Sequence, residues 1–347
     1  MAELLLNVEH LSKSYTHERG LFDAIRGRHA PPTTRPALDD VSLALHVGET
    51  LGIVGESGSG KSTLARCLTL LEQPDGGRVL LDGVDLTRLR GRELRDQRRR
   101  IQVVFQDPYS SLNPRLSVRD AIGEVLIVHR LGPRSEVQTR TVKLLDQVGL
   151  SERALDRFPS EFSGGQRQRI CIARALAAEP ALLIADEAVS ALDVSIQAQI
   201  LNLFVDLREQ LGLAMLFISH NLHVVRHVAP HVAVMFGGRI VELVPETMRL
   251  EDAEHPYTRS LYAAAPRLRA TGPALQEMVA ADLAARLPVV GCPFRDRCPR
   301  AFDRCAMEDP ALLDVGPGHL VACHAVAPSH ASEHPAQTSN PIYRRTV

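Results

Sequence analysis

The chain has 347 residues, of which 45% are hydrophobic and 23% are charged, and its formal net charge is −1 at pH 7. This is the composition of an ordinary globular protein, and so small a net charge argues against general nucleic-acid binding. The N-terminal sequence is too acidic for a secretory signal, and no apolar run approaches the ~20 residues that span a membrane. We therefore expect membrane association only through a partner.

The N-terminal region predicts strands around an irregular insertion. Residues 4–15 are expected to form a strand ending at Tyr15, an aromatic residue that would either stack on a nucleotide base or pack at the strand end. Residues 16–37 are rich in His, Arg, Gly and Pro without periodicity, which indicates a loop insertion. Alternating apolar residues over 41–47 predict a half-buried strand.

Residues 55–62 read GESGSGKS and match the phosphate-loop pattern G-x-x-x-x-G-K-[ST]. A buried strand is expected over 51–54 and a helix over 63–72, so the loop N–H groups lie at a helix N-terminus, where the dipole favours anions. Glycines let the backbone approach phosphates closely, and Lys61 adds a positive charge near the β and γ groups. The sequence predicts nucleotide binding by Gly55, Ser57, Gly58, Ser59, Gly60, Lys61, Ser62 and Thr63.

Residues 78–106 predict a hairpin, a polar helix and another strand. Asp82-Gly83 is a favourable two-residue turn, and we expect these strands to form a small antiparallel sheet beside a parallel core. The seven arginines over 88–100 have no interleaved aromatic residues, which favours a solvated helix face over a nucleic-acid patch. The strand over 101–106 ends in Gln106, at the edge where α/β proteins place ligands, although an isolated glutamine there is usually an ordinary loop residue.

Helices are expected over 117–158, with a break at 131–133 and no recognisable chemistry. Ser163, Gly164, Gly165 and Gln166 then begin a helix that carries several arginines. A Ser and two Gly at a helix start predict a second anion-binding helix end, and the alternative is a simple N-cap.

Polar residues follow the next two buried strands. Asp186 and Glu187 come after the strand over 181–185, and beside a phosphate loop they fit a magnesium-organising Asp and a Glu that positions water or acts as a base. His220 ends the strand over 213–219, where it can contact a γ-phosphate. Between them, residues 190–193 turn into a helix with an apolar stripe expected in the core: Ile196, Ile200, Leu203, Leu207 and Leu211.

Four cysteines lie close together near the C-terminus, whereas Cys67 and Cys171 fall in predicted helices. The four have the spacing C-x5-C-x6-C-x17-C: Cys292, Cys298, Cys305 and Cys323. This spacing matches neither the C-x2-C pairs of zinc ribbons nor the tight run of bacterial ferredoxins. Four thiolates can hold zinc or an iron–sulfur cluster, and unligated thiols remain the third possibility.

Together these segments resemble the ATP-binding cassette (ABC) family over residues 4–245. In that family they correspond to the A-loop aromatic Tyr15, the Walker A loop 55–62, the Q-loop Gln106, the signature motif 162–166, the Walker B segment 182–187, the D-loop Ser190–Asp193 and the switch His220. The resemblance implies an α/β phosphate-loop ATPase with a mixed core sheet, an antiparallel β subdomain and a helical subdomain over 117–170, within an ATP-binding domain over 1–265.

A narrower resemblance is to the ATPases of oligopeptide, dipeptide and nickel importers. It rests on residues 105–114, on His255-Pro256-Tyr257-Thr258 and on the C-terminal cysteine pattern, and the insertion at 16–37 resembles that of the F-type dipeptide subunit. It implies a linker over 266–290, a small Cys-rich C-terminal domain over 291–324 with a [4Fe-4S] cluster on its four cysteines, and a disordered tail over 325–347. Two departures from the family are Ala188, where Pro is usual, and Asn221, where Asp is usual.

The resemblance implies that two such chains pair head to tail and close two ATP sites between them. Lys61 would hold the β- and γ-phosphates, and Ser62, Gln106 and Asp186 would hold Mg²⁺. Glu187 would activate water and His220 would sense the γ-phosphate, while Ser163–Gln166 and Asp193 would complete the site of the other subunit.

The implied partners are two transmembrane permease subunits, a second and different ATPase chain and, indirectly, an external solute-binding protein, with no nucleic acid. The implied location is the cytoplasmic face of the inner membrane, and the solute is a peptide or a related small molecule. The alternatives are a soluble cassette ATPase acting on nucleic acid or ribosomes, and a catalytically inert scaffold.

Overall fold

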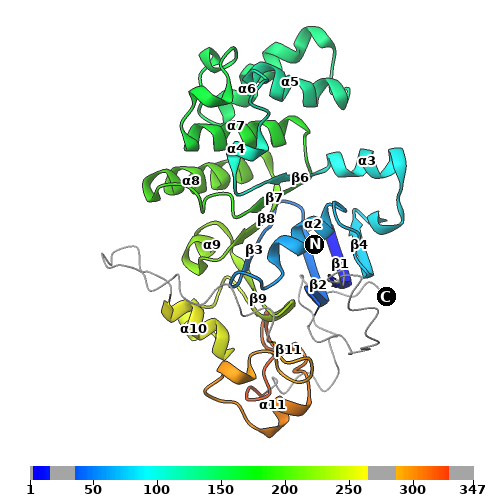
Figure 1. The fold of residues 1–347 in the computed structure, drawn as a ribbon, viewed down its shortest axis with the longest axis vertical. Helices are drawn as coiled ribbons and strands as arrows, with labels where there is room; N and C mark the ends of the chain where they lie inside the picture. Colours follow the sequence, from blue (N-terminus) through cyan, green and yellow to red (C-terminus); the bar gives the residue numbers. More distant parts are fainter. Residues whose placement is uncertain (1–2, 16–35, 265–286, 328–347) are drawn as a thin grey trace, which may run out of the picture.

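A computed structural model describes residues 3–15, 36–264 and 287–327 of the chain. Figure 1 shows a helical lobe at one end, a sheet-containing centre and, at the other end, a small C-terminal appendage formed by residues 287–327. Most of the expected insertion at 16–37, linker at 266–290 and tail at 325–347 lies outside the described residues.

The centre is built on an eight-stranded sheet in the order β11-β12-β10-β9-β3-β8-β7-β6. Its parallel part comprises β3 (Thr50–Val54), β6 (Ile101–Val104), β7 (Leu182–Asp186), β8 (Ala214–Ser219) and β9 (His231–Phe236). Three antiparallel strands extend it at one edge: β10 (Arg239–Val244), β12 (His319–Val321) and β11 (Leu313–Gly316). The C-terminal appendage therefore continues the main sheet of the chain.

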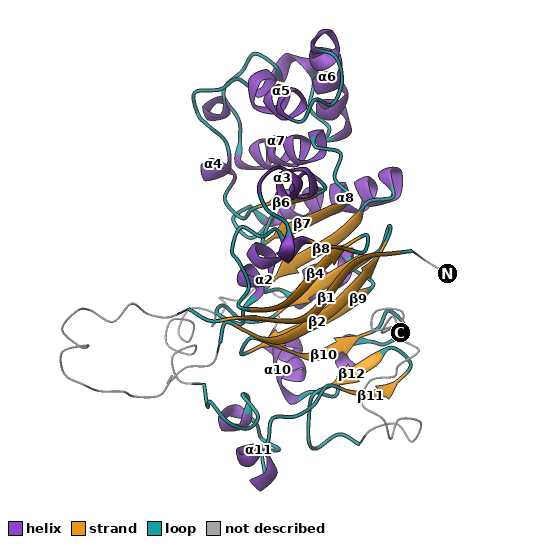
Figure 2. Cartoon of the chain, turned by 90° about the vertical axis from the view of Figure 1, so that its right-hand side faces the viewer, coloured by secondary structure: helices purple, strands orange, loops and turns teal. Residues whose placement is uncertain are grey.

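A second, four-stranded antiparallel sheet lies beside the first, in the order β2-β1-β4-β5 (Figure 2). Its strands are β1 (Leu4–Lys13), β2 (Leu38–His46), β4 (Gly76–Leu81) and β5 (Val84–Asp85). The turn between β4 and β5 lies at Asp82 and Gly83, both of which have positive φ. The predicted antiparallel sheet and its hairpin are thus confirmed.

Helices cover the sheets and form the lobe. Those packed near the sheets are α2 (Lys61–Leu68), α3 (Gly91–Arg99), α8 (Val194–Leu211), α9 (Leu222–Val228) and α10 (Pro256–Ala264), and α11 (Asp303–Met307) lies in the appendage. The lobe holds α4 (Pro108–Ser111), α5 (Val118–Val128), α6 (Val137–Gln147) and α7 (Gly164–Ala177). The predicted break at 131–133 separates α5 from α6, and short 3-10 turns occur at 86–88, 134–136, 152–154, 159–161, 250–252 and 295–297.

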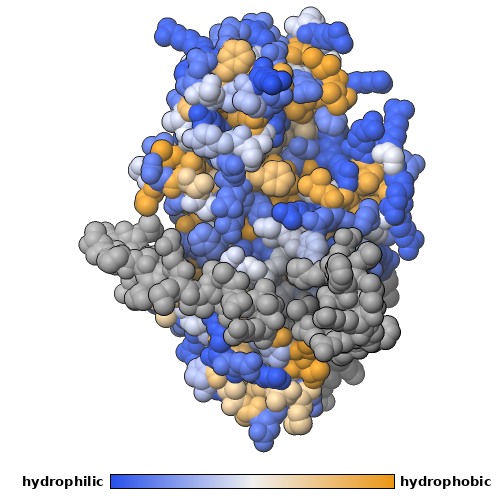
Figure 3. All heavy atoms as spheres, viewed as in Figure 1, coloured by the Kyte–Doolittle hydropathy of each residue, from blue (hydrophilic) through white to orange (hydrophobic). Residues whose placement is uncertain are grey.

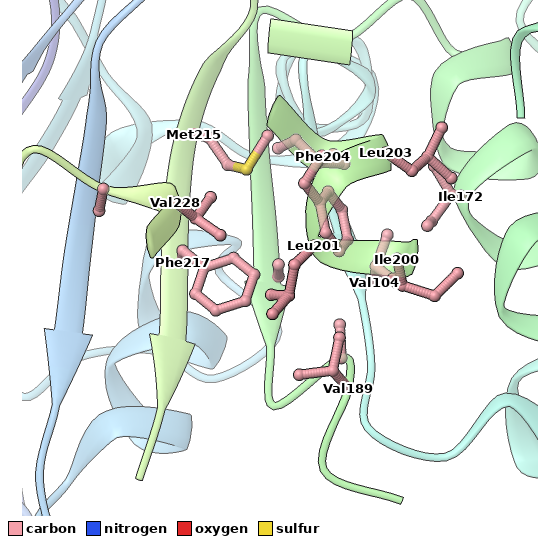
Figure 4. Packing of buried hydrophobic residues seen from close by; sticks show 14 of the residues in the cluster. Val104, Ile172, Val189, Ile200, Leu201, Leu203, Phe204, Met215, Phe217 and Val228 are labelled. Atoms are coloured by element: carbon pink, nitrogen blue, oxygen red, sulfur yellow. The ribbon is translucent and has the colours of Figure 1, made fainter. Parts of the chain in front are cut away.

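Alternation along the central strands divides the core into two hydrophobic clusters. On β8, Met215 and Phe217 face the helices, whereas Leu216 and Ile218 face the antiparallel sheet and α2. Figure 4 shows the helix side, where the Phe204 ring of α8 meets Phe217 edge to face with centroids 5.8 Å apart. Both clusters hold the ends of the central strands in register, and these ends carry the predicted site residues.

Two predictions about helix faces had different outcomes. The arginine-rich helix α3 buries only Leu94, which confirms a solvated face. The predicted core stripe of α8 is buried at Ile200, Leu203 and Leu207, but Leu211 is 45% exposed. Leu211 is the last residue of the helix, next to Gly212 with φ of 60°, where the chain turns away before β8 begins.

The described surface gives no sign of a membrane-spanning element. The face drawn in Figure 3 is largely hydrophilic, and its apolar side chains form scattered patches. Within the described ranges, none of the helices combines the length and the hydropathy needed to cross a bilayer.

Candidate nucleotide site

The phosphate loop runs between the end of β3 and the start of α2, as the sequence predicts. Two glycines are required there by close packing: a Cβ on Gly55 would lie 2.3 Å from the Met235 carbonyl oxygen, and one on Gly60 would lie 2.4 Å from that of Ala37. Gly60 is the N-cap of α2 with φ of 105°, and no side chain caps the helix. The first N–H groups of α2 are therefore available to an anion.

Lys61 is buried within this loop. Its ammonium group donates hydrogen bonds to the carbonyl oxygens of Gly55 at 2.7 Å and Glu56 at 2.9 Å, and it lies 3.4 Å from Ser59 Oγ. Burial lowers the pKa of Lys61, while the charges of Glu187 and Asp186 oppose that shift. The loop thus holds a positively charged group in place before any phosphate arrives.

Asp186 ends β7 directly beside the start of α2. Ser62 Oγ donates a hydrogen bond of 3.3 Å to Asp186 Oδ1. Burial raises the pKa of Asp186, with Glu187 adding to the shift, while the hydrogen bond from Ser62 opposes it. Hydroxyl and carboxylate oxygens suit a hard cation, and Mg²⁺ is commonly held by one or two carboxylates together with substrate phosphates. These two residues therefore fit Mg²⁺.

Glu187 has a left-handed backbone with φ of 49°, a conformation that costs a non-glycine residue about 1 kcal/mol. It is held there by its N–H bond of 2.9 Å to the Ile218 carbonyl and by Ser190 Oγ, which donates to the Glu187 carbonyl at 3.0 Å. Its Oε2 lies 3.2 Å from His220 Nδ1. This hydrogen bond is the main cause that lowers the pKa of Glu187, which keeps the carboxylate ionised.

Two predicted residues lie at the margin of this cluster. The Tyr15 hydroxyl is 3.4 Å from Thr63 Oγ1 and bonds to Glu72, which places the exposed ring beside α2. Gln106 follows β6 and is exposed, and the carbonyl of its neighbour Phe105 accepts a hydrogen bond of 3.4 Å from Gln168 Nε2. Both are accessible to a ligand.

Ser163 and Gln166 form a capping box at the start of α7. Ser163 Oγ accepts from the Gln166 N–H at 3.4 Å, and Gln166 Oε1 accepts from the Ser163 N–H at 3.1 Å. A Cβ on Gly165 would lie 2.4 Å from Ile196 Cγ2, so this helix start packs against α8, whose N-cap is the exposed Asp193. Within the described residues, no hydrogen bond of Ser163 or Gln166 reaches the phosphate loop of the same chain.

Two residues that the sequence motifs do not indicate contact the loop. The Tyr257 hydroxyl accepts a hydrogen bond of 2.8 Å from the Glu56 N–H, and Arg297 donates to both carboxylate oxygens of Glu56 at 2.7 and 2.8 Å. Sequence reasoning uses Tyr257 only as a mark of resemblance. Tyr257 and Arg297 are 201 and 241 positions away from Glu56 in the chain, so no local sequence pattern indicates these contacts.

The four C-terminal cysteines all fall in the appendage as free thiols. Burial raises the pKa of Cys292 to about 11, and the other three thiols are near enough to add to the shift. Even so, the described side chains include no group of three or more His, Cys, Asp or Glu residues arranged to hold a metal ion. The predicted [4Fe-4S] cluster is therefore not supported by this geometry.

Two family models match the chain. Residues 38–190 match the model described as ABC transporter, and residues 241–305 match that of the oligopeptide/dipeptide transporter C-terminal region.

Curated relatives extend over almost the whole chain. A protein of Sinorhizobium fredii named probable peptide ABC transporter ATP-binding protein y4tS is 50% identical over 96% of this chain and 93% of its own length. The dipeptide transport ATP-binding protein DppF of Escherichia coli is 44% identical over 93% of this chain and 94% of its own length. The di/tripeptide transport protein DppF of Pseudomonas aeruginosa is 45% identical over 93% of this chain and 98% of its own length.

Solved structures also resemble the chain. One is a dimeric post-hydrolysis state of the ATP-binding cassette MJ0796 with ADP and phosphate. It aligns at a TM-score of 0.60 with 29% identity, covering 70% of this chain and 99% of that one.

Proposed function

The chain belongs to the family of ABC transporter ATP-binding proteins, and from this we propose that it is the ATP-hydrolysing subunit of an importer for di- or oligopeptides or a related small solute. The substrate class rests on the relatives that are named for peptide or dipeptide transport and on the match of residues 241–305. The observation that carries the catalytic part is the convergence of a phosphate-loop lysine, two acids and a histidine at the ends of β3, β7 and β8.

The proposed reaction is attack of water on the γ-phosphorus of ATP, which breaks the bond to the β-phosphate oxygen and yields ADP and phosphate. Lys61 and the N–H groups of α2 bind the β- and γ-phosphates, and Glu187 accepts the proton that the attacking water loses. His220 holds the Glu187 carboxylate at 3.2 Å and senses the γ-phosphate. Tyr15, beside Thr63, supplies a ring on which adenine stacks.

Mg²⁺, when bound, neutralises charge that develops on the β- and γ-phosphate oxygens. Ser62 and Asp186 would hold it, since their oxygens already meet at 3.3 Å. Gln106, exposed at the end of β6, would complete the set of ligands, partly through water. These residues fix the position of the transferred phosphoryl group relative to Glu187.

A second ATPase chain completes the site in this proposal. Ser163–Gln166 bind no part of their own phosphate loop among the described residues, so their helix start is left to contact the nucleotide of the other subunit, together with Asp193. The related cassette MJ0796 is described as dimeric with ADP and phosphate bound. We infer a head-to-tail pair, and the family resemblance favours two different chains.

The permease would dock on the helical lobe. Exposed aromatic side chains lie on three segments that meet at the start of α7: Phe105, Tyr109 and Phe158. Arg167 links two of these segments, because its guanidinium lies 3.9 Å from the Tyr109 ring centroid and its Nε donates to the Pro159 carbonyl at 2.6 Å. Apolar surface of this kind suits a protein partner, and Gln106 next to Phe105 would report the state of the site to it.

This docking places the chain at the cytoplasmic face of the inner membrane as a peripheral subunit of two transmembrane permease chains. An external solute-binding protein would act only through those chains. The described helices offer no membrane span of their own, which is compatible with attachment through the permease.

The alternative of an ATPase acting on nucleic acid or ribosomes is not favoured. The arginines at the C-terminal end of α3 make contacts within the chain: Arg98 Nε donates to the Thr69 carbonyl at 3.0 Å, and Arg99 donates to the Ala178 carbonyl at 2.9 Å. Their hydrogen bonds hold α3 against neighbouring segments, which leaves less of the guanidinium surface for phosphates.

The iron–sulfur cluster is proposed apart from the ATPase reaction. It is supported by the four thiols in one appendage and by the family resemblance, while the described side chains form no metal-holding group, so no step of the mechanism is assigned to it. Iron and sulfide analysis of protein purified without oxygen decides the matter. A colourless sample without iron would end the proposal.

The experiment that tests the function compares wild-type protein with Glu187→Gln and Lys61→Ala in the complex assembled with its permease. We expect Glu187→Gln to lower the ATPase kcat by about a hundredfold or more while ATP still binds, and Lys61→Ala to weaken ATP binding. Both should stop uptake of labelled dipeptide. ATPase activity that responds to DNA or ribosomes but not to the permease would contradict the proposal.

A further inference from the structure

The C-terminal appendage is anchored in the core of the nucleotide-binding part. Phe294 is buried, and its ring lies 5.3 Å from that of Phe236 on β9 and 5.4 Å from that of Tyr257 on α10, centroid to centroid. Phe236 and Tyr257 are themselves 4.5 Å apart. Because these three rings form one cluster, residues close to Phe294 are held at a fixed position relative to β9.

Arg297 is the last residue of the short 3-10 turn that begins after Phe294, and its side chain contacts the phosphate loop. Its guanidinium lies 5.7 Å from the Phe236 ring centroid and 5.4 Å from that of Phe294, while its two terminal nitrogens bond to the two carboxylate oxygens of Glu56. A guanidinium fork that is stacked on rings and paired with both oxygens of a carboxylate is a directional contact. The side chains are 36% and 32% exposed, so solvent screens the pair in part.

The backbone of Glu56 is held by a second residue of this cluster. Tyr257, which is fully buried, accepts the Glu56 N–H. The start of its helix is fixed by Glu242, a fully buried residue whose carboxylate accepts the N–H groups of Glu254 at 2.8 Å and His255 at 3.2 Å. The same carboxylate lies 2.8 Å from His319 Nε2 on β12 of the appendage. The contacts of Tyr257 and Arg297 with Glu56 are therefore both linked to the C-terminal residues.

Glu56 is an unfavourable residue for a loop that binds triphosphate, because its carboxylate adds a negative charge beside the phosphates. Arg297 offsets that charge and also turns the carboxylate toward the appendage. Removing Arg297 would leave the Glu56 carboxylate without this ion pair and would release the contact between the Glu56 side chain and the appendage.

We propose that Arg297 of the Cys-rich appendage is a positioning residue for ATP, which neutralises Glu56 and holds the phosphate loop in its binding conformation. This inference rests on the proposed nucleotide site and adds a role for the appendage within the subunit. Cys298 is the next residue along the chain, so a change of the appendage around the cysteines would reach the loop through Arg297.

The test is a double-mutant cycle on ATP affinity. Each variant is made in the Glu187→Gln background, and Mg²⁺-ATP binding is measured by calorimetry at two salt concentrations. We expect Arg297→Gln to raise the Kd for ATP about tenfold, because it leaves a lone charge beside the phosphates. Glu56→Gln/Arg297→Gln should return the Kd to within about twofold of Glu56→Gln alone, since the charge to be neutralised is gone.

Two more variants distinguish a positioning role of Arg297 from a general loss of structure. Arg297→Lys keeps the charge but loses the fork, so its Kd should lie between those of the wild type and Arg297→Gln, and it serves if Arg297→Gln does not fold. Arg304→Gln is the matched control, since Arg304 pairs with Glu308 inside the appendage, and its Kd should equal that of the wild type. In the hydrolysing protein, Arg297→Gln should raise KM with little change in kcat.

The outcomes distinguish this inference from the proposed function. An Arg297→Gln protein that binds ATP within about twofold of the wild-type Kd would overturn the role of Arg297 and leave the ATPase assignment intact. The same holds if the double variant is as weak as Arg297→Gln alone, because the effect would then not pass through Glu56. If the wild-type protein itself neither binds nor hydrolyses ATP, the proposed function fails.

Discussion

The hydroxyl oxygen of Tyr257 lies 2.8 Å from the backbone nitrogen of Glu56, although the two residues are 201 positions apart in the chain. Burial raises the pKa of Tyr257, so the hydroxyl stays protonated and neutral at any ordinary pH. The N–H of Glu56 is thereby turned into the protein interior and away from the phosphates. This bond sets the path of the loop immediately after Gly55.

Replacing Tyr257 by Phe should weaken ATP binding several-fold. The ring cluster would be preserved, but the Glu56 N–H would lose its acceptor, which costs about 1–3 kcal/mol for a buried group. Calorimetric ATP titration and thermal unfolding measure the two effects. Tyr262→Phe on the same helix is the control, because the Tyr262 hydroxyl bonds to Glu251 at the surface and should change neither. An unchanged Kd in Tyr257→Phe would show that the loop follows its path without this bond.

A methyl group on Gly55 should strongly weaken nucleotide binding. Its Cβ would lie 2.3 Å from the Met235 carbonyl oxygen and 2.6 Å from Ser59 Oγ, so either β9 or the loop must move. We expect Gly55→Ala to raise the Kd for ATP by at least about a hundredfold, a loss of nearly 3 kcal/mol. Gly316→Ala, where a Cβ meets nothing within 4 Å, is the matched control. Binding at near wild-type affinity would mean that the loop relaxes without losing its function.

The stability of the chain should fall in mild acid because of His255. Burial lowers the pKa of His255 from 6.5 to about 4, so the folded state keeps this imidazole neutral while the unfolded state takes up a proton. The contribution of neutral His255 to the free energy of unfolding is therefore complete above pH 6.5 and is lost as the pH falls toward 4. The expected slope is about 1.4 kcal/mol per pH unit, or about 2 kcal/mol between pH 7 and pH 5.

Denaturant unfolding of wild type and His255→Asn at both pH values measures this contribution. His255 Nδ1 accepts the Tyr257 N–H at 3.1 Å at the start of α10, and an Asn side chain can supply the same acceptor. We expect the variant to be less stable at pH 7, because it loses the buried ring that contacts Phe294, but to lose about 2 kcal/mol less than the wild type on going to pH 5. Equal losses in the two proteins would rule out His255 as the titrating group.

Much of the nucleotide site could be predicted from the sequence because its main elements follow one another directly in the chain. A strand, a glycine loop and a helix are consecutive in the chain, so residues 51–68 fold together by short-range rules. Asp186 and His220 each end a buried strand of one parallel sheet, and such ends meet at one edge. The contacts of Ser62 with Asp186 and of Glu187 with His220 follow from that geometry.

The appendage was less predictable because its contacts are long-range. Nothing around residues 313–321 indicates that β12 will pair with β10 and β11 with β12, since the partner of each strand is chosen by the packing of the whole sheet. Arg297 likewise lies in a polar stretch of the sequence, and its partner Glu56 is 241 positions away, so no local pattern indicates the contact. Leu211 is a different case. An apolar stripe predicts which face of a helix is buried, but it does not show where that face stops being covered at the end of the helix.

In the proposed pair, each ATP site is shared by two subunits, and a change at Ser163 tests which of the two nucleotides this residue contacts. Its hydroxyl caps α7 and makes no hydrogen bond to the phosphate loop of its own chain among the described residues, so a change there should spare ATP binding to the single chain. Ser163→Asn retains a good N-cap and should leave the free energy of unfolding within about 0.5 kcal/mol of the wild type, whereas it places a larger side chain where the nucleotide of the other subunit would lie.

In the assembled complex we expect ATP turnover to fall by at least about tenfold, because the start of α7 could no longer approach the phosphate charge closely. Steady-state ATPase assays of the complex and ATP titrations of the isolated chain give the two numbers. If ATP binding to the isolated chain falls as much as turnover in the complex, then Ser163 serves its own phosphate loop and the head-to-tail arrangement is wrong.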